Sequence, residues 1–137
     1  KAFLLLILVL ATGMAGTFVA LDLILFFIFF ELVLLPMYFM IGIWGDRTEI
    51  RLPGFKKPVE TRLYASIKFF LFTLFGSAFM LLGFLALFFR SGDSLGANTF
   101  DMVALAEAGQ AGAFGGAYGG WVFAALFLGF AVKVPMW

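Results

Sequence analysis

The stretch LDLILFFIFFELVLLPMYFMIGIWG, residues 21–45, decides the fold of this chain. It is almost wholly apolar, with Asp22 at one end and Trp44 near the other. An α-helix rises about 1.5 Å per residue, so roughly 25 residues can cross a hydrocarbon core about 30 Å thick. The stretch therefore predicts a transmembrane helix.

Glu31 lies close to the middle of this predicted helix. A charged group at that depth costs about 2.5–3.5 kcal/mol on insertion scales, so it normally faces a helix bundle or a wet cavity. Pro36 follows five residues later and lacks an amide hydrogen, which leaves the carbonyl of Leu32 without its helical donor and predicts a helix break or kink. Glu31 either belongs to a proton pathway or only fixes helix packing.

The composition predicts an all-α polytopic membrane protein. The 137 residues are 64% hydrophobic and only 12% charged, whereas soluble domains are nearer 45–50% apolar and about 25% charged. A net charge of +1 does not favour a nucleic-acid partner. The chain has no Cys and no His, which excludes cysteine-held iron–sulfur clusters, His- or Cys-ligated haem and the usual zinc sites within it. We therefore predict no cofactor-binding or metal-binding residues here.

Four apolar runs predict four spans in a single membrane-domain fragment, residues 1–137. The spans are expected at about 1–20, 22–44, 64–89 and 118–137. Asp22 is expected to cap the second helix. The loop at 45–63 carries five basic residues, whereas the segment 90–117 carries one, so the first loop is predicted inside and the second outside.

Smaller signals refine this arrangement. Gly13 and Thr17, and Gly16 and Ala20, are small residues four apart that permit close helix contact, although lipid-facing filler is an equal alternative. Gly76 and Gly83 are seven apart, share one face and suggest a packing seam. A turn is expected at 53–54. Thr99 is expected to cap a short surface helix reaching Glu107, followed by a flexible glycine-rich stretch.

Two lysines lie within predicted spans. Lys68 comes about one turn into the third span, where it either snorkels to the interface or relays protons. Lys133 lies about 18 Å into the run that opens at Trp121, and Pro135 follows it. A broken helix at membrane depth is typical of an ion site, but a snorkelling lysine at a helix end is the alternative.

Three blocks resemble a known family: LDLILFFIFFELVLLPMYFMIGIWG, YASIKFFLFTLFGSAFMLLGFLALFF and LGFAVKVPMW. Their order and spacing resemble the fourth to seventh helices of subunit M, or chain 4, of proton-translocating NADH–quinone oxidoreductase, respiratory complex I. The resemblance implies an antiporter-like helix bundle in which Glu31 and Lys133 form a charged pair for proton translocation. Lys68 matches a lysine found in some members at the start of the sixth helix, which makes it a candidate proton relay. The resemblance also implies that the helix carrying Lys133 is broken, in agreement with Pro135.

The resemblance further implies the setting. The partners would be other membrane subunits of complex I, the lipid bilayer and protons, in a bacterial cytoplasmic membrane or an equivalent energy-converting membrane. NADH, FMN, iron–sulfur clusters and quinone are expected on other subunits, so this chain would belong to a translocase without its own redox chemistry. The alternatives are a subunit of a multisubunit sodium/proton antiporter, which shares the fold, and a structural membrane scaffold.

Overall fold

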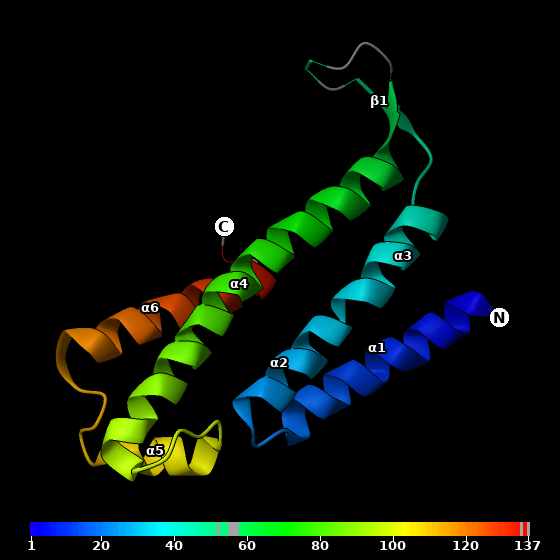
Figure 1. Ribbon diagram of the computed structural model, residues 1–137. Helices are drawn as coiled ribbons and strands as arrows, with labels where there is room; N and C mark the ends of the chain where they lie inside the picture. The colour runs from blue at the N-terminus through cyan, green and yellow to red at the C-terminus, as the bar shows by residue number, and fades with distance from the viewer. Residues whose placement is uncertain (52, 55–57, 135, 137) are drawn as a thin grey trace.

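The computed structural model describes residues 1–137 except 52, 55–57, 135 and 137. Most of the described chain is α-helical (Figure 1). The helices are α1 (Ala2–Val19), α2 (Leu23–Leu32), α3 (Leu34–Trp44), α4 (Thr61–Leu95), α5 (Met102–Gln110) and α6 (Gly116–Lys133). Two short strands, β1 (Glu49–Ile50) and β2 (Val59–Glu60), pair antiparallel.

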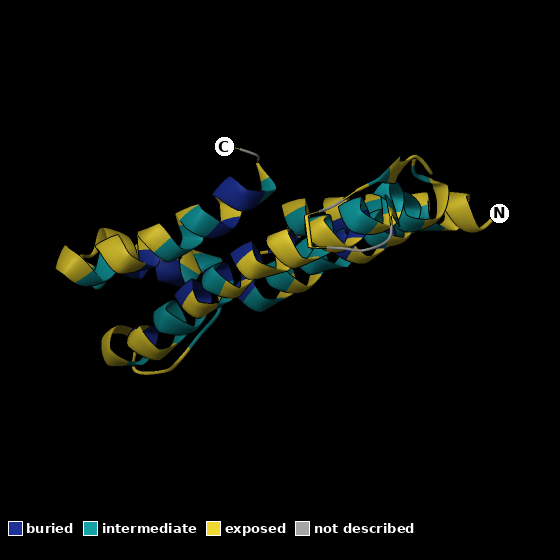
Figure 2. Cartoon of the chain, turned by 90° about the horizontal axis from the view of Figure 1, so that it is seen from above, coloured by how far each residue is buried: buried dark blue, intermediate teal, exposed yellow. Residues whose placement is uncertain are grey.

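Four helical segments are long and apolar enough to cross a membrane. They are α1, the α2–α3 segment Leu23–Trp44, α4 and α6. Much of their surface is exposed, as Figure 2 shows, and large apolar side chains such as Phe18 project from it. A bilayer or neighbouring membrane helices would cover such a surface. The prediction of an all-α polytopic membrane protein is confirmed.

The first two helices form a tight antiparallel pair. The Asp22 carboxylate accepts hydrogen bonds from the backbone amides of Ile24 (2.9 Å) and Leu25 (3.0 Å), which confirms the predicted cap. Gly16 is buried against α2, and a Cβ there would overlap the ring of Phe29. The small residues of α1 therefore serve close helix contact and are not lipid-facing filler.

A short interruption separates α2 from α3. Helix α2 ends at Leu32 and helix α3 begins at Leu34, while Val33 keeps right-handed helical angles of φ −64° and ψ −28°. The chain therefore continues in nearly the same direction (Figure 1). Pro36 is fully buried just after the interruption, and its missing amide accounts for a weakened hydrogen-bond ladder at Leu32. Glu31 consequently lies in the last turn of α2.

Helix α6 crosses closely over α4. A Cβ on Gly76 would lie 2.7 Å from the Cβ of Val132, and one on Gly129 would lie 2.6 Å from the Cβ of Met80. Gly83 faces Leu126 on the same side of α4, so the predicted seam is confirmed. Met80, which is 0% exposed, forms the centre of the core. Figure 1 shows that α6 ends beside the middle of α4, which agrees with the contact between Gly76 and Val132, the residue before Lys133.

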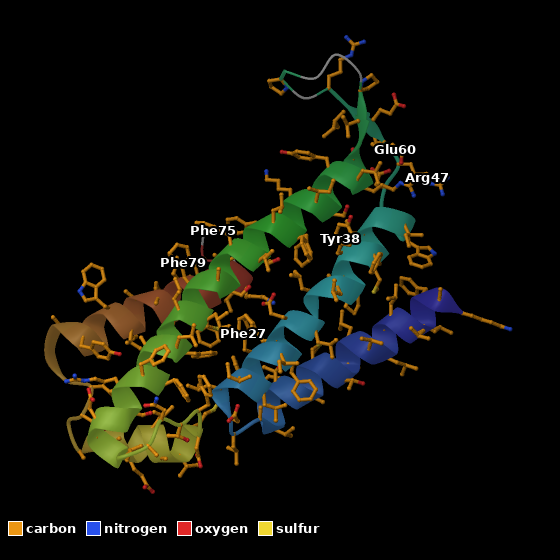
Figure 3. All side chains as sticks on the ribbon, in the orientation of Figure 1. Phe27, Tyr38, Arg47, Glu60, Phe75 and Phe79 are labelled. Atoms are coloured by element: carbon orange, nitrogen blue, oxygen red, sulfur yellow. The ribbon has the colours of Figure 1, made fainter. Side chains whose placement is uncertain are left out.

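Helix α4 contacts α3 on one side and is exposed on another. On the side toward α3, Tyr38 lies against Phe70, with 5.3 Å between ring centroids. Phe75 and Phe79 meet edge-on on the other side of the helix, with 5.0 Å between ring centroids (Figure 3). At 35 residues, α4 is longer than the predicted 64–89 segment, because the helix continues past Arg90 and ends at Gly96 in the left-handed conformation (φ +75°).

The connections lie at two opposite ends of the helices. The α1–α2 turn bonds to the segment before α5 through Leu23 N to Phe100 O (2.9 Å) and Met102 N to Leu21 O (2.8 Å). These two connections therefore lie at the same end, as alternating spans require. The β1–β2 hairpin lies at the other end (Figure 1), with a turn at 53–54.

Two details of the second connection differ from the predictions. Asp101, not Thr99, caps α5, because its carboxylate accepts from the amides of Val103 (2.8 Å) and Ala104 (3.3 Å). The Thr99 hydroxyl instead accepts from the Asp101 amide. The glycines from 116 onward are helical, since α6 begins there and the hydroxyl of Tyr118 donates to the carbonyl of Ala86 on α4 (2.5 Å).

Candidate functional site

The structure brings Glu31 and Lys133 together. Glu31 lies in the last turn of α2 and Lys133 is the last residue of α6. The Nζ atom of Lys133 lies 3.8 Å from Oε1 of Glu31, and the two side chains are only 18% and 19% exposed. An acid and a base from distant parts of the sequence therefore meet between apolar helices.

The closest polar contact of the Lys133 ammonium is with Phe30. Nζ donates a hydrogen bond to the backbone carbonyl of Phe30 at 3.0 Å. It also lies 4.0 Å from the centroid of the Phe30 ring, within range of a cation–π interaction. The last carbonyls of a helix lack intrahelical donors, and the end of α2 at Leu32 puts Phe30 among them.

The Glu31 carboxylate is less well satisfied. Its Oε1 is buried and has no hydrogen-bond partner within the described part of the chain, because 3.8 Å exceeds a hydrogen-bond length. A pocket of about 400 Å³ opens beside Glu31 between α2, α3 and α4, with Phe27 and Phe70 among its apolar walls. The carboxyl group thus has an ammonium on one side and an apolar pocket on the other.

The pair is close enough for each group to influence the other's protonation. Two unit charges 3.8 Å apart interact by about 4 kcal/mol at an effective dielectric constant near 20. Protonating Glu31 would remove this attraction, and so would deprotonating Lys133. A small change in the separation of α2 and α6 can therefore favour proton uptake at one group and proton release at the other.

Lys68 lies elsewhere. Its side chain is exposed on α4, with Nζ 5.4 Å from the centroid of the Tyr64 ring. It lines a groove of about 510 Å³ that also includes Ile50 of β1. Among the described residues it forms no ion pair, and the structure does not join it to Glu31 or Lys133. Pro135, the second predicted break, lies outside the described residues.

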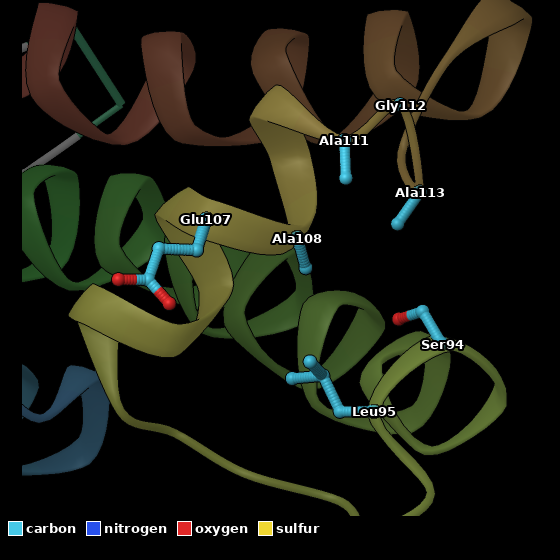
Figure 4. A pocket seen from close by; sticks show the side chains of 7 residues that line it. All are labelled: Ser94, Leu95, Glu107, Ala108, Ala111, Gly112 and Ala113. Carbon is cyan, nitrogen blue, oxygen red and sulfur yellow. The ribbon is translucent and has the colours of Figure 1, made fainter.

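A further pocket lies between the end of α4 and α5. Figure 4 shows Ser94 and Leu95 opposite Ala108 and the residues that follow α5, around a volume of about 540 Å³, with Glu107 at the edge of the pocket. Glu107 is exposed there, and neither residue of the ion pair lines this pocket. The described residues hold no group of three or more acidic, His or Cys side chains that could bind a metal ion.

Phe30 is the residue of the site that sequence reasoning missed. It stands in the run FFIFFE, where four phenylalanines precede Glu31 and none is chemically distinct. Only the position of α6 shows which ring and which carbonyl face Lys133. The one available signal was its place directly before an acid in the middle of a span.

Membrane-crossing helices that enclose an acid and a base define an integral membrane protein with an ionisable centre. A family model described as "NADH:quinone oxidoreductase/Mrp antiporter, TM" matches residues 20–137, and the chain belongs to this family. This agrees with the order of the three sequence blocks noted above.

The curated relatives carry one function in their names. NADH-quinone oxidoreductase subunit M of Rhodobacter capsulatus is 38% identical over 100% of this chain and 25% of its own length. Chain 4 of the NADH-ubiquinone oxidoreductase of Prototheca wickerhamii is 39% identical over 99% and 22%, respectively. Subunit M of Rickettsia felis is 34% identical over 99% and 23%.

These matches confirm the resemblance to subunit M. The chain spans about a quarter of the length of these relatives. Its apolar helices make it an integral membrane protein, and the bacterial relatives support a bacterial membrane as its location.

Proposed function

We propose that this chain forms part of a proton-translocating subunit of NADH–quinone oxidoreductase, in which Glu31 and Lys133 carry protons. One observation supports the proposal above the others. An acid and a base lie 3.8 Å apart between helices long enough to span a bilayer. Ionisable residues at such depth are costly and usually mark ion or proton pathways.

The proposed cycle takes up one proton at Glu31 and releases one proton from Lys133. While the pair is close, charged Lys133 favours ionised Glu31. When the pair loosens, the Glu31 carboxylate takes up one proton and the Lys133 ammonium releases one further along the path. When the pair closes again, the proton moves from Glu31 to Lys133, which restores the starting charges. Each cycle thus transfers one proton, net, from the side that protonates Glu31 to the side that receives the proton of Lys133.

The energy for opening the pair would come from other subunits. We propose that those subunits bind NADH, FMN, iron–sulfur clusters and quinone, so that this chain contributes to a translocase without its own electron transfer. Its partners would be other membrane subunits of complex I and the bilayer, with protons as the cargo. Lys68 would act on a separate branch of the proton path, since its side chain lies on the exposed face of α4.

A subunit of a multisubunit sodium/proton antiporter is a second candidate, because the matching family model includes Mrp antiporters. Co-purification with NADH- or quinone-binding subunits would favour the oxidoreductase. A passive scaffold predicts that Glu31 and Lys133 lie far apart, and the 3.8 Å separation argues against it.

Replacing Glu31 by Gln in the intact complex tests the proposal. We expect proton pumping in sealed vesicles to fall by at least about tenfold, because the side chain keeps its shape but can no longer take up a proton. The matched control is Glu107→Gln on α5, an exposed acid outside the pair, which should pump normally. Undiminished pumping by a normally assembled Glu31→Gln complex would remove Glu31 from the mechanism.

A further inference from the structure

We infer that Phe30 is a positioning residue that holds the Lys133 ammonium while Glu31 gains and loses its proton. This inference rests on the proposed function and deepens it. The ammonium lies 3.0 Å from the carbonyl oxygen of Phe30 and 4.0 Å from its ring centroid, whereas the carboxylate oxygen of Glu31 is 3.8 Å away. Within the described site, Phe30 therefore supplies the one hydrogen bond that the ammonium makes.

Both Phe30 contacts are independent of the charge on Glu31. A carbonyl oxygen accepts from an ammonium, and the negative face of an aromatic ring attracts it, whether or not the neighbouring acid is ionised. A buried ammonium that lost its only counter-charge would otherwise be left unsatisfied among apolar side chains. Phe30 thus allows Glu31 to become neutral without expelling Lys133 from the site.

The unpartnered Glu31 oxygen supports this division of roles. Since Oε1 receives no hydrogen bond from the described residues, the carboxylate is free to accept a proton there. If Glu31 alone held Lys133, protonation of Glu31 and release of the Lys133 ammonium from the site would be one event. With Phe30 as the anchor, they become two separate steps.

Neighbouring rings fix the Phe30 ring in place. Phe26, one turn earlier on α2, stacks on it at 5.6 Å with an interplanar angle of 21°. Phe130, on α6 and one turn before Lys133, meets it edge-on at 5.9 Å and 78°. The ring therefore bridges the two helices that carry the acid and the base, and any shift of α6 moves Lys133 and Phe130 together against it.

The test compares variants at position 30 in the intact complex reconstituted in vesicles. Phe30→Leu removes the ring face and keeps an apolar side chain and the carbonyl. We expect it to weaken the hold on the ammonium roughly 5- to 30-fold, the range of a buried cation–π contact, and to move the alkaline limb of the pumping profile about one pH unit toward neutral. Phe30→Trp, which keeps a ring face, should show the wild-type pumping profile.

Two comparisons make the result decisive. Phe127→Leu removes an exposed ring from α6 that stacks on Phe123 and not on Phe30, so it should leave the profile unchanged. Trifluorophenylalanine at position 30 keeps the shape of the ring while weakening its negative face, and it covers the case in which Phe30→Leu fails to assemble. It should shift the profile in the same direction as Phe30→Leu.

The outcomes separate this inference from the proposed function. If Glu31→Gln stops pumping while the leucine and trifluorophenylalanine variants keep the wild-type profile, Phe30 has no positioning role and the pair still translocates protons. If Glu31→Gln itself pumps normally, the proposed function fails. Phe30 acts through packing alone if Phe30→Leu and Phe30→Trp both lose pumping while the trifluorophenylalanine variant pumps normally.

Discussion

Gly76→Ala should disturb the ion pair from a distance, through the seam between α4 and α6. The added Cβ would lie 2.7 Å from the Cβ of Val132 and 2.9 Å from both of its methyl groups, where ordinary contacts begin near 3.4 Å. Helix α6 must therefore move by roughly 1 Å, since such overpacking otherwise costs about 1–3 kcal/mol. Val132 directly precedes Lys133, so the ammonium moves with it.

The magnitude follows from Coulomb's law. Lengthening the Glu31–Lys133 separation from 3.8 Å to about 5 Å lowers the attraction by about 1 kcal/mol at an effective dielectric constant near 20. That loss corresponds to a roughly fivefold change in the balance between closed and open pairs. We expect a reduced number of protons pumped per NADH oxidised, measured in sealed vesicles with NADH oxidation followed in parallel.

The matched control is Gly120→Ala on α6. A Cβ at this helical glycine meets no atom within 4 Å, so the change should leave pumping intact and stabilise the helix by up to about 1 kcal/mol. Val132→Ala in the Gly76→Ala background removes the two overlapping methyl groups and should partly restore pumping. If Gly76→Ala and Gly120→Ala pump equally well and assemble equally well, the seam does not set the position of Lys133.

Two further predictions concern the connections. Hydrogen bonds from the hydroxyl (2.7 Å) and the backbone amide (3.1 Å) of Thr48 hold the pKa of Asp46 below its ordinary value. At pH values above the ordinary pKa of Asp46, these hydrogen bonds therefore stabilise the hairpin, and the contribution is lost as the pH falls through the lower pKa of the folded state. Thr48→Val should raise the pKa of Asp46 in an NMR titration. At the other end, Asp101→Ala should destabilise α5 by about 1 kcal/mol in amide hydrogen exchange, whereas Thr99→Ala should have a smaller effect; equal effects would contradict the assignment of the cap.

The sequence was sufficient for the features set by composition and local geometry. Runs of apolar residues located the membrane-crossing helices, and Asp22 at the start of such a run identified a helix cap. Gly76 and Gly83 share a face because they are seven residues apart, and that face turned out to contact α6. These signals depend on residues close together in the sequence, so they can be read without knowledge of the tertiary structure.

Other features depended on which groups meet in space. Thr99 and Asp101 are both good caps in sequence, and the backbone bonds of 100 and 102 to the α1–α2 turn decide between them. Arg90 suggested the end of α4, but a charged residue does not stop a helix that leaves the hydrocarbon layer. Phe30 could not be separated from its neighbours until α6 placed Lys133 beside it.

The most direct test of the central claim is the infrared signal of the Glu31 carboxyl group with and without Lys133. Infrared difference spectroscopy of the protein in lipid reports the stretching band of a protonated carboxyl group, and loss of the band in Glu31→Gln assigns it to this residue. We predict that Lys133→Met changes the frequency of this band, because the ammonium 3.8 Å away is removed and the local electric field changes with it. A Glu31 band at the same frequency in both proteins would contradict the account.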